Sequence, residues 1–154
     1  MTNETINGKP MHPRVAGLQL GLADMFEPYG IERSDLANVH SVLFAMRMAA
    51  AQADVFALDG AFADVADSEG YREEAALARR LGYLGKSCIH PRQVALANQA
   101  FAVSDAEIES ARRIVEAARE PGNQGRGAFM VDGKMVDLPF LKRAQALLAA
   151  AHKP

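Results

Sequence analysis

Polar side chains that could take part in chemistry follow three short apolar segments, at the point where each segment ends. They are Asp24, Asp59 with Gly60, and His90. Catalytic loops of barrel enzymes follow the carboxyl ends of parallel strands, so these positions favour a role in a site. A carboxylate there could bind a hard divalent cation, and an imidazole could orient a substrate carboxylate or thioester.

Each of these residues also has a structural interpretation. Asp24 could form a turn or cap a helix, and Asp59 with Gly60 could make a tight turn. His90 precedes Pro91, a residue suited to the first turn of a helix, so its imidazole could serve as a cap or a packing group. The residue types alone leave both interpretations open.

Another candidate, Asp137, lies near the end of the sequence in "KMVDLPFL". Aspartate is a favoured N-cap, and Leu138 with Pro139 is a plausible first helical turn. Upstream, Asp132 and Gly133 separate "GAFMV" from "KMVD", and a type I′ turn favours such a residue pair. These residues predict a β-hairpin followed by a helix. A two-stranded hairpin is barely stable alone, so it must pack against something.

The elements expected to position these residues alternate between strands and helices from residue 14 onward. Strands are predicted at 15–20, 55–59 and 85–89. Helices are predicted from residues 36, 71, 92, 105 and 138. That order is typical of parallel βαβ units.

Two details of the helices can be predicted as well. Ser104 and Glu107 have the spacing of a capping box at the start of the helix from residue 105. Charges on the helix from residue 71, among them Glu73 and Glu74, are expected to form a solvated face.

Composition limits the class of protein. The 154 residues are 49% hydrophobic, which suffices for one domain with a core. With 17 basic and 19 acidic residues, there is no electrostatic footprint for nucleic acid or an anionic membrane. The first 14 residues lack the pattern of a signal peptide, and no apolar stretch approaches the roughly 18 residues of a membrane span, so we expect a cytoplasmic protein. Cys88 is the only cysteine, which excludes an intramolecular disulfide, and we expect it to be buried.

We expect three regions: an N-terminal tail at 1–13, a domain of βα units at 14–119, and a linker, hairpin and helix at 120–154. Three βα units are too few for a closed (βα)8 barrel, which takes about 250 residues. The sheet therefore either stays open or is completed by something else.

Four stretches, in order, resemble the citrate lyase beta subunit family within the larger aldolase and citrate lyase superfamily. They are "GLADMF", "ALDGAFADVADSEGY", "LGYLGKSCIHPRQV" and "GRGAFMVDGKMVDLPFLKRA". The resemblance covers residues 13–150 and corresponds to the C-terminal half of the family's fold. It implies an α/β fold: the later βα units of a TIM barrel, followed by a β-hairpin and helix extension that docks over a neighbouring subunit's site.

The resemblance also implies a function. Family members cleave or form a carbon–carbon bond of a 3-hydroxyacyl-CoA, of the citryl-CoA, malyl-CoA or citramalyl-CoA type, by Mg2+-assisted enolate chemistry. Asp24 matches the family's metal ligand. Asp137 matches an aspartate that acts in acid–base chemistry on the adjoining chain. Asp59, Gly60 and His90 are then expected to bind the acyl-CoA or the oxo acid.

Other hypotheses stay open. The family's glutamate ligand and a substrate-binding arginine lie upstream of the matched region, so the alternative is a truncated non-catalytic homologue, or a half-enzyme that needs a partner chain. Glu27 is either a local substitute ligand or a solvated loop residue. Lys86 and Arg92 either meet coenzyme A phosphates or are solvated.

A third hypothesis is a pyruvate-type metal aldolase, but this class lacks the "VDGKMVD" hairpin. Exposed strand edges predict a homo-oligomer or a partner chain that completes the barrel.

Overall fold

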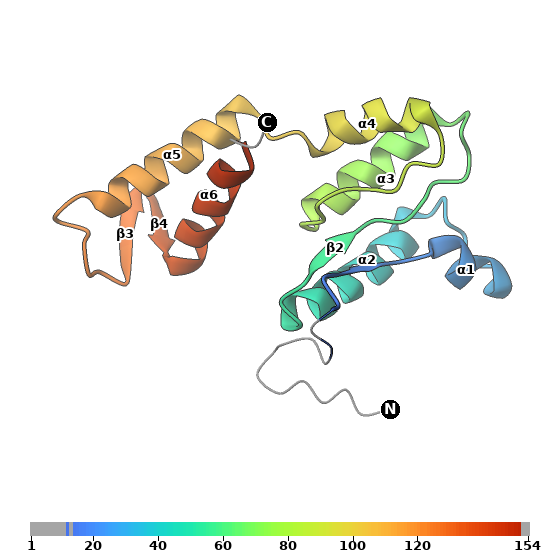
Figure 1. Cartoon of the computed structure of the whole chain (residues 1–154), viewed down its shortest axis with the longest axis horizontal. Helices are drawn as coiled ribbons and strands as arrows, with labels where there is room; N and C mark the ends of the chain where they lie inside the picture. The colour runs from blue at the N-terminus through green and yellow to red at the C-terminus, as the bar shows by residue number, and fades with distance from the viewer. Residues whose placement is uncertain (1–11, 13, 152–154) are drawn as a thin grey trace. The chain divides into compact units, whose positions relative to one another are not determined.

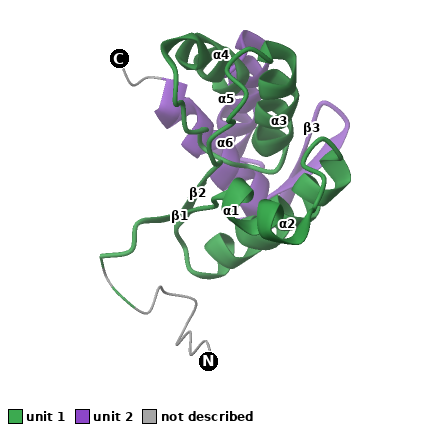
Figure 2. Cartoon of the chain, turned by 90° about the vertical axis from the view of Figure 1, so that its right-hand side faces the viewer, with its two compact units in different colours: residues 1–102 green, residues 103–154 purple. Residues whose placement is uncertain are grey.

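The computed structural model describes His12 and residues 14–151, and these residues form two compact units. Residues 1–102 belong to unit 1 and residues 103–154 to unit 2 (Figure 2). The domain boundary expected from the sequence lay after residue 119. The contacts instead group the helix at 105–119 with the hairpin. None of the helices in the described part of the chain is long and apolar enough to cross a membrane.

Unit 1 is built around a parallel βαβ unit, visible in Figure 1. Its elements are β1 (Gly17–Gln19), α1 (Leu22–Phe26), the 3-10 helix η1 (Glu27–Tyr29), α2 (Leu36–Gln52), β2 (Phe56–Leu58), α3 (Ser68–Arg80) and α4 (Pro91–Phe101). β1 pairs in parallel with β2, with Gly17 opposite Phe56 and Gln19 opposite Leu58. The parallel pairing predicted from the alternation of elements is confirmed for these two strands.

The core of unit 1 follows from the apolar spacing along α2. Its buried side chains are Val39, Leu43, Met46 and Ala50, three or four residues apart, which is the period of one helix face. They pack with buried residues of α1 and α3, among them Leu22, Phe26, Leu77 and Ala78. Asp35 begins α2 as its N-cap, because its carboxylate accepts the Ala37 N–H at 2.9 Å.

The predicted third strand at 85–89 is wrong as a full strand. Only an isolated parallel bridge joins Asp59 and Lys86. The Asp59 N–H donates to Gly85 O at 2.9 Å, and the Ser87 N–H donates to Asp59 O at 3.1 Å. The ladder stops there because the next groups bond elsewhere: the Ile89 N–H donates to the Gln93 side chain at 2.9 Å.

Two expectations about burial are also wrong. Cys88 is exposed, because the chain leaves the sheet after Ser87, and its thiol contacts the Tyr71 hydroxyl at 3.3 Å. Glu74 is not part of a solvated face. It is 2% exposed because ion pairs draw it into the interior, whereas its neighbour Glu73 is exposed as expected.

Unit 2 contains α5 (Asp105–Arg119), β3 (Ala128–Val131), β4 (Lys134–Asp137) and α6 (Leu138–Ala151). The predicted hairpin is confirmed: β3 and β4 are antiparallel, and Asp132 and Gly133 have φ values of 50° and 74°. Both residues of a type I′ turn require positive φ. The predicted capping box is confirmed too, since the Glu107 N–H donates to Ser104 Oγ at 3.3 Å and the Ser104 N–H donates to Glu107 Oε2 at 2.9 Å.

Candidate active site

The carboxyl ends of β1 and β2 lie at the same edge of the sheet, because the strands are parallel. Gly60, just after β2, packs against the connection that leads from β1 to α1. A Cβ on Gly60 would lie 2.3 Å from Leu20 O, so only glycine allows this approach. The structure therefore brings the Asp59–Gly60 segment next to the connection that precedes Asp24.

Asp59 belongs to a buried charge cluster, which we define as Arg33, Asp59, Glu74 and Lys86. The Lys86 ammonium donates to Asp59 Oδ2 at 2.6 Å and to Glu74 Oε1 at 2.5 Å. The Arg33 guanidinium donates to both oxygens of Glu74, at 2.6 and 3.0 Å. The side chains of Asp59 and Lys86 are fully buried. A buried charge is tolerated only when it is paired and hydrogen-bonded, as each of these is.

The two carboxylates of the cluster differ in their electrostatics. Burial raises the pKa of Asp59, and the Lys86 charge offsets this only in part. Burial also acts to raise the pKa of Glu74, but the hydrogen bond from Arg33 and the charge of Lys86 outweigh it, so that the pKa of Glu74 lies below its usual value. Glu74 faces two cations, whereas Asp59 bonds to one, which accounts for the difference.

The cluster corrects the expectation for Lys86. Its ammonium neither faces solvent nor is free to meet a phosphate, because two carboxylates hold it in the interior. Arg92, the other cation considered, is exposed. The sequence signal for the cluster was a lysine within the predicted strand at 85–89.

The interpretation of Asp59 and Gly60 as a tight turn is wrong, because Asp59 lies in the bridge to Lys86 and the backbone after it runs on without a turn. The Gly60 N–H donates to Asp59 Oδ1 at 2.7 Å. The Gln19 side chain donates to Asp59 O at 3.1 Å and also contacts Ser87 Oγ, linking the ends of the three segments. Substrate binding by Asp59 and Gly60 stays a prediction.

His90 is the N-cap of α4: its Nδ1 accepts the Arg92 N–H at 3.2 Å. The capping interpretation is thus confirmed for this residue, and its role in substrate binding stays a prediction. Asp67 caps α3 by accepting the Gly70 N–H at 2.8 Å, and Asp64 accepts the Ala66 N–H at 2.9 Å. Both behave as ordinary turn and cap residues.

Asp24 is exposed in the first turn of α1, whose N-cap is Gly21, so Asp24 is not the cap. Glu27 is also exposed, within η1. Among the residues that the structure describes, no group of three or more histidine, cysteine, aspartate or glutamate side chains could hold a metal ion. Asp24 therefore offers one accessible carboxylate rather than a complete site.

A hollow of about 320 Å3 lies beside these residues in unit 1. Its walls include Ala23 of α1, Glu27 of η1, Arg33 of the charge cluster, Phe62 and Asp64. The Arg33 guanidinium lies 5.3 Å from the centre of the Phe62 ring. The hollow has the size of a small-molecule pocket and borders the segment that carries Asp24.

Asp137 is in unit 2, at the end of β4, and is half-buried. Its Oδ1 is buried without a hydrogen-bond partner in the part of the chain that the structure describes. A buried polar atom left unpaired costs free energy, so such atoms are few in folded proteins. The four other candidates, Asp24, Asp59, Gly60 and His90, all belong to unit 1.

Comparisons with known proteins find similarity over most of the chain. A family model described as C-C bond lyase of the TIM-barrel fold matches residues 3–152. Citrate lyase subunit beta of Haemophilus influenzae is 38% identical over 141 residues, which is 90% of this chain and 48% of that protein. The L-malyl-CoA/beta-methylmalyl-CoA lyase of Rhodobacter capsulatus is 31% identical over 158 residues, 91% of this chain and 50% of that protein. The chain thus spans about half the length of the curated relatives it matches.

Solved structures agree. Protein CitE from Mycobacterium tuberculosis, solved in complex with magnesium, acetoacetate and coenzyme A, superposes with a TM-score of 0.63 at 34% identity, covering 81% of this chain and 45% of that one. A citrate lyase from Burkholderia xenovorans superposes with a TM-score of 0.74, covering 91% of this chain and 46% of that one. At 24% identity, the second likeness shows the fold alone.

Proposed function

Because the chain belongs to the C-C bond lyase family of the TIM-barrel fold, we propose that it contributes half of the active site of a coenzyme A ester lyase. The observation that carries the proposal is the similarity to citrate lyase subunit beta and a malyl-CoA lyase over about nine-tenths of the chain. The proposed substrate is a 3-hydroxyacyl-CoA of the citryl-CoA, malyl-CoA or citramalyl-CoA type.

In the proposed cleavage, the bond between C2 and C3 of the acyl group breaks. The hydroxyl on C3 gives its proton to a water molecule and becomes the carbonyl of an oxo acid. The bonding electron pair moves to C2 and gives a thioester enolate, and a proton delivered to C2 then gives the acyl-CoA. We assign that proton to Asp137, acting on the site of an adjoining chain. The assignment is supported by Asp137 Oδ1, which no hydrogen bond engages among the described residues.

We assign Asp24 as one ligand of Mg2+. The ion, when bound, would polarise the carbonyl oxygen of the oxo acid. Mg2+ commonly takes only one or two protein carboxylates and keeps several waters, which fits the exposed Asp24 carboxylate as a single ligand. Any further protein ligand would come from outside the described residues.

The remaining candidates would shape the rim of the site. Gly60 keeps backbone close to the β1–α1 connection, and His90 fixes the start of α4 at the end of the third segment. We propose that Gly60 and His90 position the thioester. Asp59 would act through its backbone and through Lys86, because its carboxylate is fully buried.

We further propose that a second copy or a partner chain completes the barrel. Apolar side chains at the surface of unit 1 support this, since Phe44 and Met48 of α2 and Phe56 of β2 are 41–51% exposed. β1 has a neighbour on one side only in the described sheet, and such edges tend to be covered. The hypothesis of a half-enzyme is the version of this proposal in which the chain is active only when a partner chain completes the barrel.

The experiment is to supply the purified chain with Mg2+ and each of the three thioesters, and to measure released acetyl-CoA together with the heat of binding. We expect Mg2+-dependent release. If neither release nor heat is detected, the chain alone is not a lyase.

Asp137→Asn tests the assigned proton donor. Asparagine keeps the size and shape of the aspartate side chain but cannot deliver a proton, so we expect an unchanged melting temperature and a rate lower by roughly 10²-fold to 10⁴-fold. Unchanged turnover would remove Asp137 from the mechanism.

A further inference from the structure

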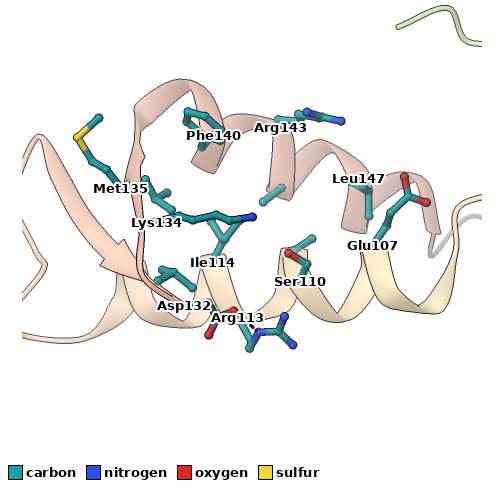
Figure 3. A pocket seen from close by; sticks show the side chains of 14 residues that line it. Glu107, Ser110, Arg113, Ile114, Asp132, Lys134, Met135, Phe140, Arg143 and Leu147 are labelled. Atoms are coloured by element: carbon teal, nitrogen blue, oxygen red, sulfur yellow. Dashed lines mark hydrogen bonds and ion pairs between the residues drawn. The ribbon is translucent and has the colours of Figure 1, made fainter. Parts of the chain in front are cut away.

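Unit 2 contains a groove that none of the proposed lyase chemistry uses. It has a volume of about 380 Å3 and lies between α5, the hairpin and α6 (Figure 3). Two small residues, Ala111 of α5 and Ala144 of α6, face the groove at 4% and 5% exposure. Because their side chains end at Cβ, the two helices leave a hollow between them.

The floor of the groove is apolar. Besides the two alanines it includes Ile114, Val136 and Leu147, and Phe140 and Met135 stand at its rim with more than half of their surface exposed. Buried apolar surface gains roughly 25 cal/mol per Å2, so an apolar body placed here would be stabilised. The hollow lies within the size range of small-ligand sites.

The acidic side chains around the groove have partners, whereas two of its basic side chains do not form ion pairs among the described residues. Of its two acids, Asp132 accepts the Arg113 Nε–H at 2.9 Å, and Glu107 closes the capping box of α5. Lys134 and Arg143 have no ion pair among the described residues. In Figure 3, Lys134 extends across the groove over Ile114, while Arg143 projects from the α6 wall. Two cations therefore stand over an apolar floor without a neutralising acid.

We propose that this groove binds a small amphipathic organic anion, with an apolar body on the floor and one anionic head between Lys134 and Arg143. The Ser110 hydroxyl lies on the α5 wall of the same groove. Charge complementarity selects an anion over a neutral or cationic amphiphile of equal length. This inference does not rest on the proposed lyase function.

The probe for the test is decanoate, titrated into the full chain by calorimetry, with decanol and decylamine as neutral and cationic counterparts. We expect saturable one-to-one binding of decanoate, weaker binding of decanol, none of decylamine, and loss of affinity as salt is raised. The double variant Lys134→Gln/Arg143→Gln should bind decanoate roughly tenfold or more weakly, because two charge-assisted hydrogen bonds are removed.

The matched control is Arg112→Gln/Lys142→Gln, which removes the same charge from two exposed residues outside the groove lining, one on α5 and one on α6, and it should bind as the parent does. Ala144→Leu fills the hollow and should also weaken binding, with circular dichroism checking that the helices persist. No saturable binding, equal binding by both double variants, or equal binding of decylamine would overturn the proposal. So would a dimer that decanoate dissociates and that the groove variant cannot form, because the groove would then be an interface between copies.

Discussion

At the scale of single residues, Lys86 connects several parts of unit 1, although no sequence motif indicated this role. Its ammonium is the shared partner of Asp59 and Glu74, and Lys86 is also the residue that pairs with Asp59 in the parallel bridge. The charge cluster joins Asp59, at the end of β2, to Glu74 of α3. Loss of one of its charges should therefore disturb both the packing of the interior and the position of the Asp59–Gly60 segment.

Lys86→Met should destabilise unit 1 by about 3–5 kcal/mol, because it leaves two buried carboxylates without a shared counter-ion. All three tyrosines of the sequence, Tyr29, Tyr71 and Tyr83, are in unit 1, so urea unfolding followed by tyrosine fluorescence reports this unit selectively. Arg72→Met is the control, because it breaks only the exposed pair with Glu69 and should cost less than about 1 kcal/mol. Similar losses of unfolding free energy in both variants would show that Lys86 does not stabilise unit 1 through its buried ion pairs.

Glu74 should make the stability of unit 1 sensitive to acid. Its pKa in the folded chain is lowered from 4.5, so its stabilisation is complete above that value and is lost as the pH falls through the folded-state pKa. Asp59 has the opposite sign, because a raised pKa gives stabilisation that is lost as the pH rises through the folded-state value.

The change that tests this is Glu74→Gln. The difference in unfolding free energy between the parent and this variant should be largest near neutral pH and should shrink below pH 4.5, measured by the same fluorescence assay. Asp59→Asn serves as the comparison, and its difference from the parent should not shrink in that way. A Glu74→Gln difference that stays constant down to about pH 3 would show that the ion pairs do not set the acid stability.

At the scale of elements, the turn between β3 and β4 depends on left-handed backbone. Gly133→Val should destabilise unit 2 by about 1–2 kcal/mol, because a β-branched residue is strained at a φ of 74°. Thermal unfolding by far-UV circular dichroism measures the loss. Gly122→Val is the control, since its φ is not positive and a Cβ there has nothing within 4 Å. If the two variants melt alike, the turn does not limit the stability of unit 2.

Local chemistry explains which elements could be predicted. The capping box at Ser104 and the Asp132–Gly133 turn are set by residues adjacent in sequence, and both are confirmed. The segment 85–89 was mispredicted because its apolar pattern is that of a strand, whereas the hydrogen bond from Ile89 to Gln93 ends the ladder. The burial of Glu74 depends on partners 12 and 41 residues away in sequence, a relation that helix periodicity does not contain.

At the scale of the whole molecule, the resemblance to the citrate lyase beta subunit family is confirmed, and so is the partial TIM-barrel fold. The described strands form two two-stranded sheets and no closed barrel. Four candidate site residues lie in unit 1 and Asp137 lies in unit 2. The sequence indicated these residues through motif order, but motif order carries no information about which chain supplies Asp137.

Mixing two inactive variants tests whether Asp24 and Asp137 of one active site come from different chains. Asp24→Asn and Asp137→Asn should each lack acetyl-CoA release, and an equimolar mixture should recover about a quarter of the parent rate, because in a cyclic assembly a quarter of the sites pair an intact Asp24 with an intact Asp137 from the neighbour. Parent chain diluted with the double variant provides the reference. If Asp137 served its own chain, the mixture of single variants would stay inactive.

The exposed thiol of Cys88 gives this chain a chemical handle that needs no engineering. Because the sequence holds no second cysteine, a maleimide dye attaches at one known position, two residues before the cap of α4. A fluorophore fixed there stands beside the rim residues. Its emission would report directly whether a metal ion, a thioester or another polypeptide arrives at that end of the strands.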